Sequence, residues 1–351
     1  MLEAVLVAGV YIATVIGAGF ASGSELVSYF VRYGRISFFG LVLAAVLFGL
    51  LAAMITKRVK STGSADFYAY LEQIMPGPLA VLYRKLTALF MMVVFIAMAA
   101  GTGEALSAFF GIAKSWGVLL LCLLCFFVFQ YDLKGLMAAN GALSALIITG
   151  IIGVCWYVLQ FREVHVFSAF SAIADNWVTA GASYVSYNIL TAGVILAEMG
   201  RTMKRGRYGL VGILSGGAIF CLLLCLWAVI SIYYGKIPLD SIPMMTICKR
   251  QGPVISGIYL IVLFAAMLTT ALSNGYAVVE RLSQATSRRM AVGLTLCFGY
   301  FGAGFSFTVF VDVIYRILGY LGALLVIFVL WDGIKMKKKE NVRKSMKTKV
   351  I

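Results

Sequence analysis

The chain has 351 residues, of which 62% are hydrophobic and 12% charged, and its formal net charge is +15. Soluble domains are about half apolar and about a quarter charged, so this composition excludes a soluble enzyme, a nucleic-acid-binding module and a secreted disulfide scaffold. The apolar segments repeatedly reach the roughly 20 residues that cross a bilayer as a helix, which predicts an integral membrane protein.

Ten apolar segments predict ten transmembrane helices and hence an all-α membrane protein. Each segment is continuously apolar and does not alternate with polar residues, which is the pattern of a spanning helix. The predicted spans are residues 2–31, 36–56, 86–110, 116–130, 136–159, 176–199, 208–234, 253–282, 290–305 and 309–332.

The positive charges predict how these spans are oriented. Most of the 29 Lys and Arg residues lie in alternate connections between spans and in the tail, residues 334–351. Cytoplasmic connections carry such an excess, so both the N- and C-termini are predicted to be cytoplasmic. Charge in these places indicates a lipid bilayer with anionic headgroups as the partner, with no nucleic acid involved. Nothing in the sequence indicates an oligomeric state.

The first span is interrupted by glycines. Apolar helix runs to Ile16, residues 17–23 include three glycines, and helix resumes at Ser24. Each glycine costs a helix about 1 kcal/mol relative to alanine, and unwound backbone must line a protein-enclosed cavity. Ser22 and Glu25 have the spacing of a capping box, which favours a new helix start within the span. The alternative is close helix packing through small residues.

The sixth span has a similar polar centre. Residues 184–188 read Tyr-Val-Ser-Tyr-Asn, Gly181 precedes them, and Ser186 or Asn188 can cap a second half-helix. We therefore predict that this span is also broken. Two interrupted helices, five spans apart, indicate a transport site at the middle of the membrane.

The two interruptions divide the chain into matching halves. Residues 1–160 are predicted to form a first repeat of five spans and residues 161–333 a second, followed by the basic tail, residues 334–351. Because each half has an odd number of spans, the halves must be inverted relative to each other in the membrane.

This arrangement resembles the LeuT fold of the amino-acid–polyamine–organocation superfamily, a 5+5 inverted repeat with broken helices 1 and 6. The string from Ile16 to Glu25, IGAGFASGSE, is similar to that of the YkvI-type amino-acid permeases of bacteria. The resemblance implies a multi-pass protein of the bacterial plasma (inner) membrane that transports a small solute.

The resemblance also implies a sodium site between the first and the eighth predicted spans, residues 2–31 and 253–282. The carried-over ligands are the carbonyls of Ala13, Ile16 and Ala266 and the hydroxyls of Thr269 and Thr270. Five oxygens without a carboxylate suit a monovalent cation that must also leave. The alternative is that the two threonines bond back to the preceding turn of their own helix. Some proton-coupled relatives place a Lys from the fifth span here; this span has none, which favours sodium over a proton.

The two interrupted segments supply the predicted substrate site. Exposed amides after Gly17 and the positive end of the second half-helix suit a carboxylate, while the sixth span offers groups for an ammonium. Aromatic packing of the tyrosines and helix–helix hydrogen bonding of the asparagine are the alternatives. The substrate-binding candidates are Gly17, Ala18, Gly19, Phe20, Ser22, Tyr184, Ser186, Tyr187, Asn188 and Asn274.

Four ionisable residues in the outer half of the membrane are candidates for gating or coupling: Glu25, Glu104, Asp312 and Arg316. Each is costly at a helix centre, so each should face a cavity or an opposite charge. Asp312 and Arg316 are four residues apart and can pair on one helix face. Glu104 has no evident local partner. We predict that Arg316 and either Glu25 or Glu104 form an outer gate.

These features together predict a sodium-coupled secondary transporter of a small amino-acid-like solute that works by alternating access. One alternative is a proton-coupled permease that uses Glu104, and another is a cation channel with an acidic outer ring. An enzyme is not predicted, because the single histidine excludes a two-histidine zinc protease helix and no nucleophile or phosphate-binding motif is apparent.

Overall fold

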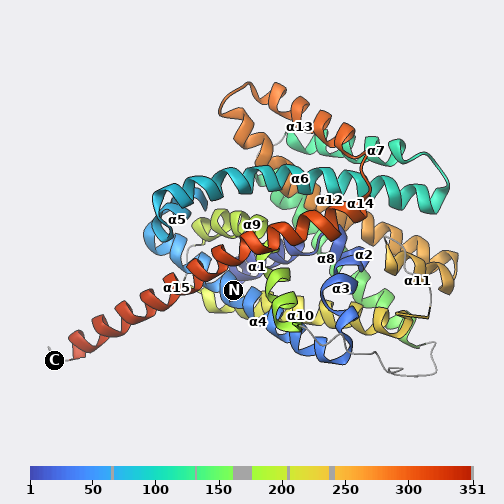
Figure 1. The fold of residues 1–351 in the computed structure, drawn as a ribbon. Helices are drawn as coiled ribbons and strands as arrows, with labels where there is room; N and C mark the ends of the chain where they lie inside the picture. The colour runs from blue at the N-terminus through green and yellow to red at the C-terminus, as the bar shows by residue number, and fades with distance from the viewer. Residues whose placement is uncertain (65–66, 131–132, 161–175, 204–205, 237–241, 349–351) are drawn as a thin grey trace.

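The structure, a computed structural model, describes residues 1–64, 67–130, 133–160, 176–203, 206–236 and 242–348, and the regular secondary structure in these residues is helical. Figure 1 shows one helical bundle from which the C-terminal end of the last helix projects. The helices of the first part of the chain are α1 (Leu2–Val15), α2 (Ala18–Ser22), α3 (Ser24–Tyr29), η1 (Val31–Ile36), α4 (Ser37–Thr62), α5 (Phe67–Ile74), α6 (Gly77–Phe110), α7 (Lys114–Phe129) and α8 (Leu133–Gln160). Those of the second part are α9 (Trp177–Thr202), α10 (Tyr208–Tyr233), α11 (Pro243–Gln251), α12 (Pro253–Ser283), α13 (Arg288–Gly302), α14 (Phe307–Val309), η2 (Phe310–Ile314) and α15 (Tyr315–Thr348).

Seven helical segments in the described residues are long and apolar enough to cross a membrane. They are Val31–Thr62, Gly77–Phe110, Asn140–Gln160, Trp177–Arg201, Tyr208–Tyr233, Pro253–Ser283 and Ile317–Met336. The other three predicted spans coincide with shorter helices, namely α1, α7 and α13. A multi-pass all-helical membrane protein is therefore confirmed, while the count of ten crossings stays a prediction.

The first predicted span consists of three short helices. α1 ends at Val15, and Gly17 adopts an extended conformation before α2 begins. Gly23 then has φ +83°, in the left-handed region that favours glycine, and α3 follows directly. The chain thus changes direction at two glycines where the sequence predicts an interruption.

The predicted interruption of the sixth span is wrong, because α9 is continuous from Trp177 to Thr202. Its polar side chains bond back to their own helix and do not cap a new one. The hydroxyl of Ser186 donates to the carbonyl of Ala182 at 2.7 Å. The side-chain amide nitrogen of Asn188 donates to the carbonyl of Tyr184 at 2.9 Å. These bonds satisfy the polar groups without unwinding the backbone.

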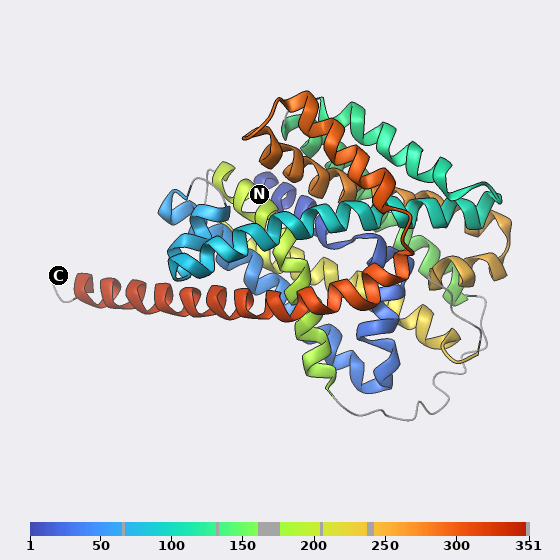
Figure 2. The ribbon, with the colours of Figure 1, turned by 45° about the horizontal axis from the view of Figure 1, so that its top comes forward.

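Glycines let the helices approach closely. A Cβ atom on Gly212 of α10 would lie 2.5 Å from the carbonyl oxygen of Gly49 on α4, and one on Gly216 would lie 2.9 Å from that of Ala45. Lipid gives apolar helices little reason to associate, so backbone contact through small residues supplies the packing energy. Glycines also bring α9 close to α4 and α15, the two helices on which it packs (Figure 2).

Candidate functional site

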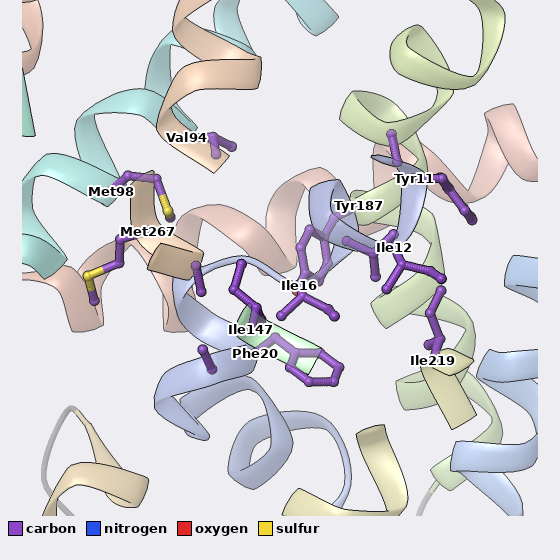
Figure 3. Close-up of a cluster of buried hydrophobic side chains, with 14 of the residues drawn as sticks. Tyr11, Ile12, Ile16, Phe20, Val94, Met98, Ile147, Tyr187, Ile219 and Met267 are labelled. Carbon is purple, nitrogen blue, oxygen red and sulfur yellow. The ribbon is translucent and has the colours of Figure 1, made fainter. Parts of the chain in front are cut away.

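The interruption after α1 lies inside the protein. Ile16 and Phe20 are fully buried, and Figure 3 shows them beside Tyr187 of α9, with Ile147 of α8 and Met267 of α12 in the same cluster. The cluster collects side chains from α1, α2, α6, α8, α9, α10 and α12. Backbone groups released by the interruption therefore face protein and not lipid, as the absence of water in the bilayer core requires.

The end of α1 faces α12 at Thr270. A Cβ atom on Gly17 would lie 3.4 Å from the hydroxyl oxygen of Thr270. That hydroxyl is buried and has no hydrogen-bond partner among the described residues. The N–H of Gly17 donates to the carbonyl of Val15 at 2.9 Å, so the carbonyl of Ala13 lacks the donor that a continuing helix would supply. Polar oxygen atoms without donors thus meet where α1 ends.

The hydroxyl of Thr269 behaves as the alternative interpretation expected. It donates to the carbonyl of Ala266 in its own helix at 3.0 Å. Asn274 does the same, since its amide nitrogen donates to the carbonyl of Thr270 at 2.9 Å. The hydroxyl of Thr270 and the amide oxygen of Asn274 are both buried without a partner among the described residues, and the contact with Gly17 places Thr270 close to the end of α1.

The predicted capping box between Ser22 and Glu25 is not formed. The hydroxyl of Ser22 donates to the carbonyl of Gly19 at 3.1 Å and accepts from the backbone N–H of Ser24 at 3.2 Å. Gly23, and not Ser22, is the N-cap of α3, because its left-handed conformation sets the direction of that helix. The side chain of Glu25 is therefore free to lie elsewhere.

The carboxyl group of Glu25 is packed against the backbone of α2. Glu25 is only 3% exposed, and a Cβ atom on Gly19 would collide with its carboxyl group and lie 2.6 Å from its Cγ. The hydroxyl groups of Tyr184 and Tyr187 face this carboxyl group. Its Oε2 atom has no hydrogen-bond partner among the described residues.

The two tyrosines that face this carboxyl group were predicted from the sequence, and two further tyrosines pack against their rings. Tyr184 and Tyr187 are predicted site residues, and their rings lie 5.7 Å apart between centroids. Tyr29 of α3 lies 5.6 Å from Tyr184, and Tyr315 of α15 stacks on Tyr187 at 5.1 Å. Tyr29 follows Glu25 by four residues, a helical spacing that could have indicated it. No local signal points to Tyr315, which only the packing of α15 brings here.

The other gate candidates are placed differently from the prediction. Glu104 has one partner nearby in the sequence and one far from it: Lys114 Nζ lies 3.3 Å from Oε1, and the backbone N–H of Phe307 donates to the same atom at 3.2 Å. The backbones of Asp312 and Arg316 lie in η2 and α15, and their side chains are outside the described part of the structure. Their predicted pairing and the predicted outer gate therefore stay predictions.

A cavity of about 560 Å³ reaches toward the site from the end of the bundle that carries Glu198, Arg201, Glu280 and Arg281. Its inner wall includes Ser273 of α12. The hydroxyl of Ser273 accepts a hydrogen bond from the amide nitrogen of Asn140 on α8 at 2.7 Å, and the amide oxygen of Asn140 has no partner among the described residues. Polar groups therefore line the way from this cavity toward Thr270.

Comparisons with known proteins agree with this architecture. No protein-family model matches the chain. It is 23% identical over 337 residues to the membrane protein YkvI of Bacillus subtilis (strain 168), covering 90% of this chain and 93% of YkvI. It is also 25% identical over 338 residues to the protein YyaD of the same organism, covering 93% and 96% of the two chains.

Several solved structures share the fold. MhsT, in complex with L-phenylalanine, matches with a TM-score of 0.71 and 16% identity over 92% of this chain and 87% of its own. A Na⁺-coupled sialic acid symporter matches with a TM-score of 0.63 and 13% identity, over 91% and 77%. Mhp1, a nucleobase-cation-symport-1 family transporter, matches with a TM-score of 0.61 and 12% identity, over 88% and 74%.

The fold and the enclosed interruption define a multi-pass membrane protein with the LeuT-type fold of these transporters. Within that class, the similarity to YkvI and YyaD along most of the chain confirms the resemblance to the YkvI-type proteins.

Proposed function

We propose that the protein is a sodium-coupled secondary transporter of a small amino-acid-like solute. It would work by alternating access in the bacterial plasma membrane, with both termini in the cytoplasm. The observation that carries this proposal is the buried hydroxyl of Thr270, which has no partner among the described residues and lies against the glycine where α1 ends. A buried hydroxyl of this kind is costly unless a ligand completes it.

The proposed sodium ligands are the carbonyls of Ala13, Ile16 and Ala266 and the hydroxyls of Thr269 and Thr270. Ala13 has lost its helical donor and Thr270 has none, so both have oxygen lone pairs to offer. Thr269 already donates its proton to Ala266 and keeps its own lone pairs for a cation. Such oxygens suit sodium, which the described sialic acid symporter uses for coupling.

The proposed substrate site narrows to the interruption and the tyrosines facing it, namely Gly17, Ala18, Gly19, Phe20, Tyr184 and Tyr187. Ser22, Ser186, Asn188 and Asn274 stay part of the proposal as neighbours, but their side chains donate hydrogen bonds to carbonyls of their own segments. The cavity of about 560 Å³ is the proposed exit toward the cytoplasm.

Contacts between the halves support the proposed inverted repeat of residues 1–160 and 161–333. The second, third and fourth predicted spans of the first half pack on the second, third and fourth predicted spans of the second half. These pairs are α4 with α10, α6 with α12 and α7 with α13. Contact between equivalent helices is expected when a twofold axis lies in the membrane plane between the halves. The basic tail, residues 334–351, is proposed to lie at the anionic cytoplasmic lipid surface.

The Lys114 partner of Glu104 weakens the proton-coupled alternative. Its carboxylate is already bound by a lysine side chain and a backbone N–H, whereas a proton carrier must be able to exchange its proton with the solution or a neighbouring group. The channel alternative needs a ring of acidic groups around one pore, yet Glu25 is enclosed by tyrosine rings and Glu104 by its own partners.

Uptake by proteoliposomes tests the proposal. A panel of radiolabelled amino acids and amines would be supplied with an inward sodium gradient, with an equal potassium gradient, or with sodium on both sides. We expect accumulation only with the inward sodium gradient, and its loss in Thr270→Val. The matched control is Thr295→Val, because Thr295 is buried on α13 and its hydroxyl already bonds Ala291 at 2.9 Å. Accumulation that is equal with sodium and potassium would refute sodium coupling.

A further inference from the structure

Glu25 is the buried ionisable group that the sodium site leaves unexplained. It lies within the membrane-spanning bundle, and no lysine or arginine among the described side chains forms an ion pair with it. A charged carboxylate without a cation is strongly destabilising in such a place. An ionisable group there is by default a functional one. The question is which cation completes it.

The surroundings of Glu25 have the composition of a site for an organic cation. The rings of Tyr29, Tyr184 and Tyr187 lie 5.6 to 5.7 Å from one another, and Tyr315 extends the group by stacking on Tyr187. Tyrosine faces attract ammonium groups, and aromatic cages are a recurrent means of binding them. The carboxyl group among them adds an opposite charge, which an aromatic cage alone lacks.

The position of Glu25 also changes what the interruption can bind. Its carboxyl group lies against Gly19, among the backbone amides that the sequence assigned to a substrate carboxylate. Two carboxylates at one buried place repel each other strongly in a medium of low dielectric constant. The amides near Gly19 therefore favour a ligand that presents a positive group there. A substrate carboxylate is better placed toward Gly17 and Thr270, on the sodium side.

Beyond the tyrosines the site becomes apolar. Figure 3 shows the ring of Tyr187 beside Ile12 and Ile16, with Phe20 and Ile147 next to them in the same buried cluster. Tyr187 thus has its hydroxyl toward Glu25 and its ring against aliphatic side chains. A ligand that satisfies both parts carries an ammonium group on an apolar body.

We propose that Glu25 and the tyrosines 29, 184, 187 and 315 bind the ammonium group of the cargo, so that the cargo is an amine with an apolar body whose amino group is indispensable. This proposal rests on the proposed transport function and specifies the substrate class of the same site. In it, the four rings surround the cation and the carboxylate of Glu25 neutralises it. A carboxylate on the cargo is not required for binding.

Matched ligand pairs test the requirement for the ammonium group. The probes are 2-phenylethylamine with 3-phenylpropionate, and isoamylamine with 4-methylpentanoate, which share an apolar body and differ in charge. We expect at least one amine to raise the unfolding midpoint of the purified protein and neither carboxylate to do so. Stabilisation by a carboxylate without its amine counterpart overturns the proposal, and so does the absence of any response to the amines.

Variants assign the response to Glu25. Glu25→Gln keeps the shape of the side chain and removes its charge, and it should weaken amine binding by about 10- to 100-fold. Asp332→Asn is the matched control, a carboxyl group that is 13% exposed and paired with Arg58 outside the proposed site, and should keep the response. Because Glu25→Gln could also disturb folding, Tyr187→Phe and Tyr187→Leu provide a second test. The ring-preserving Phe should bind the amine and Leu should not.

The outcome separates this proposal from the transport proposal. Equal amine binding by the protein and by its folded Glu25→Gln variant overturns the ammonium site, as does a stabilisation by sodium chloride alone that depends on Glu25. Sodium-driven uptake of a solute without an amino group would also overturn it while leaving the transport function intact. Amine binding that depends on Glu25, without any gradient-driven uptake, would support the site and refute the transporter.

Discussion

Substitution of Thr270 by valine should raise the stability of the protein in sodium-free solution. Valine keeps the branched shape of threonine and removes a hydroxyl that is buried and has no partner among the described residues. Gly17 of the facing segment has no side chain, and even a Cβ atom placed there would lie 3.4 Å from the hydroxyl oxygen, so this side of the interface has room for the valine methyl group. Most substitutions in a core destabilise, so an increase would be a specific result.

The magnitude follows from two opposing effects. A buried hydroxyl without a partner costs about 1–3 kcal/mol, and its removal should return about 1 kcal/mol in sodium-free solution. Sodium at 100 times its dissociation constant should stabilise the unmodified protein by about 2.7 kcal/mol. If the loss of one ligand weakens sodium binding about tenfold, the same concentration stabilises the variant by about 1.4 kcal/mol. The variant should therefore start higher and respond by about half as much.

Thermal unfolding in detergent, at constant ionic strength with potassium or sodium chloride, measures both effects. Thr295→Val is again the matched control, since it should lose the bond to Ala291 and keep the full sodium response. A Thr270→Val protein that is less stable without sodium and responds fully to sodium would refute the reasoning. The hydroxyl would then be structural and the sodium site would lie elsewhere.

Three further predictions test separate parts of the structure. Gly212→Val should lower stability by about 1–3 kcal/mol by forcing α10 away from α4, whereas Gly217→Val, with open space around its Cβ position, should have little effect on thermal unfolding. Glu104→Gln should leave the pH dependence of uptake unchanged. An unchanged pH dependence would contradict a proton-carrying role for Glu104. Tyr259→Phe removes the hydroxyl that donates to the carbonyl of Ala21 and should cost about 1 kcal/mol in thermal unfolding.

The first interruption was predictable because its signal is a property of the backbone. Three glycines within residues 17–23 weaken a helix whatever surrounds it, and the structure places changes of direction at Gly17 and Gly23. The signal in the sixth span was of another kind. Ser186 and Asn188 can cap a new helix or bond back to the preceding turn, and local sequence does not decide between the two.

Packing decides whether α9 stays continuous, and this packing depends on residues that are distant in the sequence. Gly181 of α9 lies against the backbone of Gly40 on α4, and the carbonyl of Ser186 is in direct contact with Gly322 of α15. A helix enclosed on two sides by backbone has little room to unwind. The spans were predictable from composition, but these contacts arise from helices that are far apart in the chain.

The environment of Glu25 shows the same division. The spacing from Ser22 predicted a capping role, yet Gly23 begins α3 and the carboxyl group is released to the tyrosines. The helical spacing of four residues from Glu25 could have indicated Tyr29. Tyr315 lies 290 positions after Glu25 and comes near it only through the fold. No partner was predicted for Glu104, although Lys114 lies just after the turn that follows α6.

The two proposed sites share one structural element, and this gives coupling between them a physical basis. α2 has only five residues, too few to be a stable helix by itself, so its contacts determine its position. Gly17 before it touches Thr270, and Gly19 within it touches Glu25. Ala21 near its end is held by the hydroxyl of Tyr259. A cation bound at Thr270 and an ammonium group bound at Glu25 would both act on the short segment formed by Gly17 and α2. Binding at either proposed site would then be linked to binding at the other through the position of this segment, which is the linkage that coupling of a cargo to a sodium gradient requires.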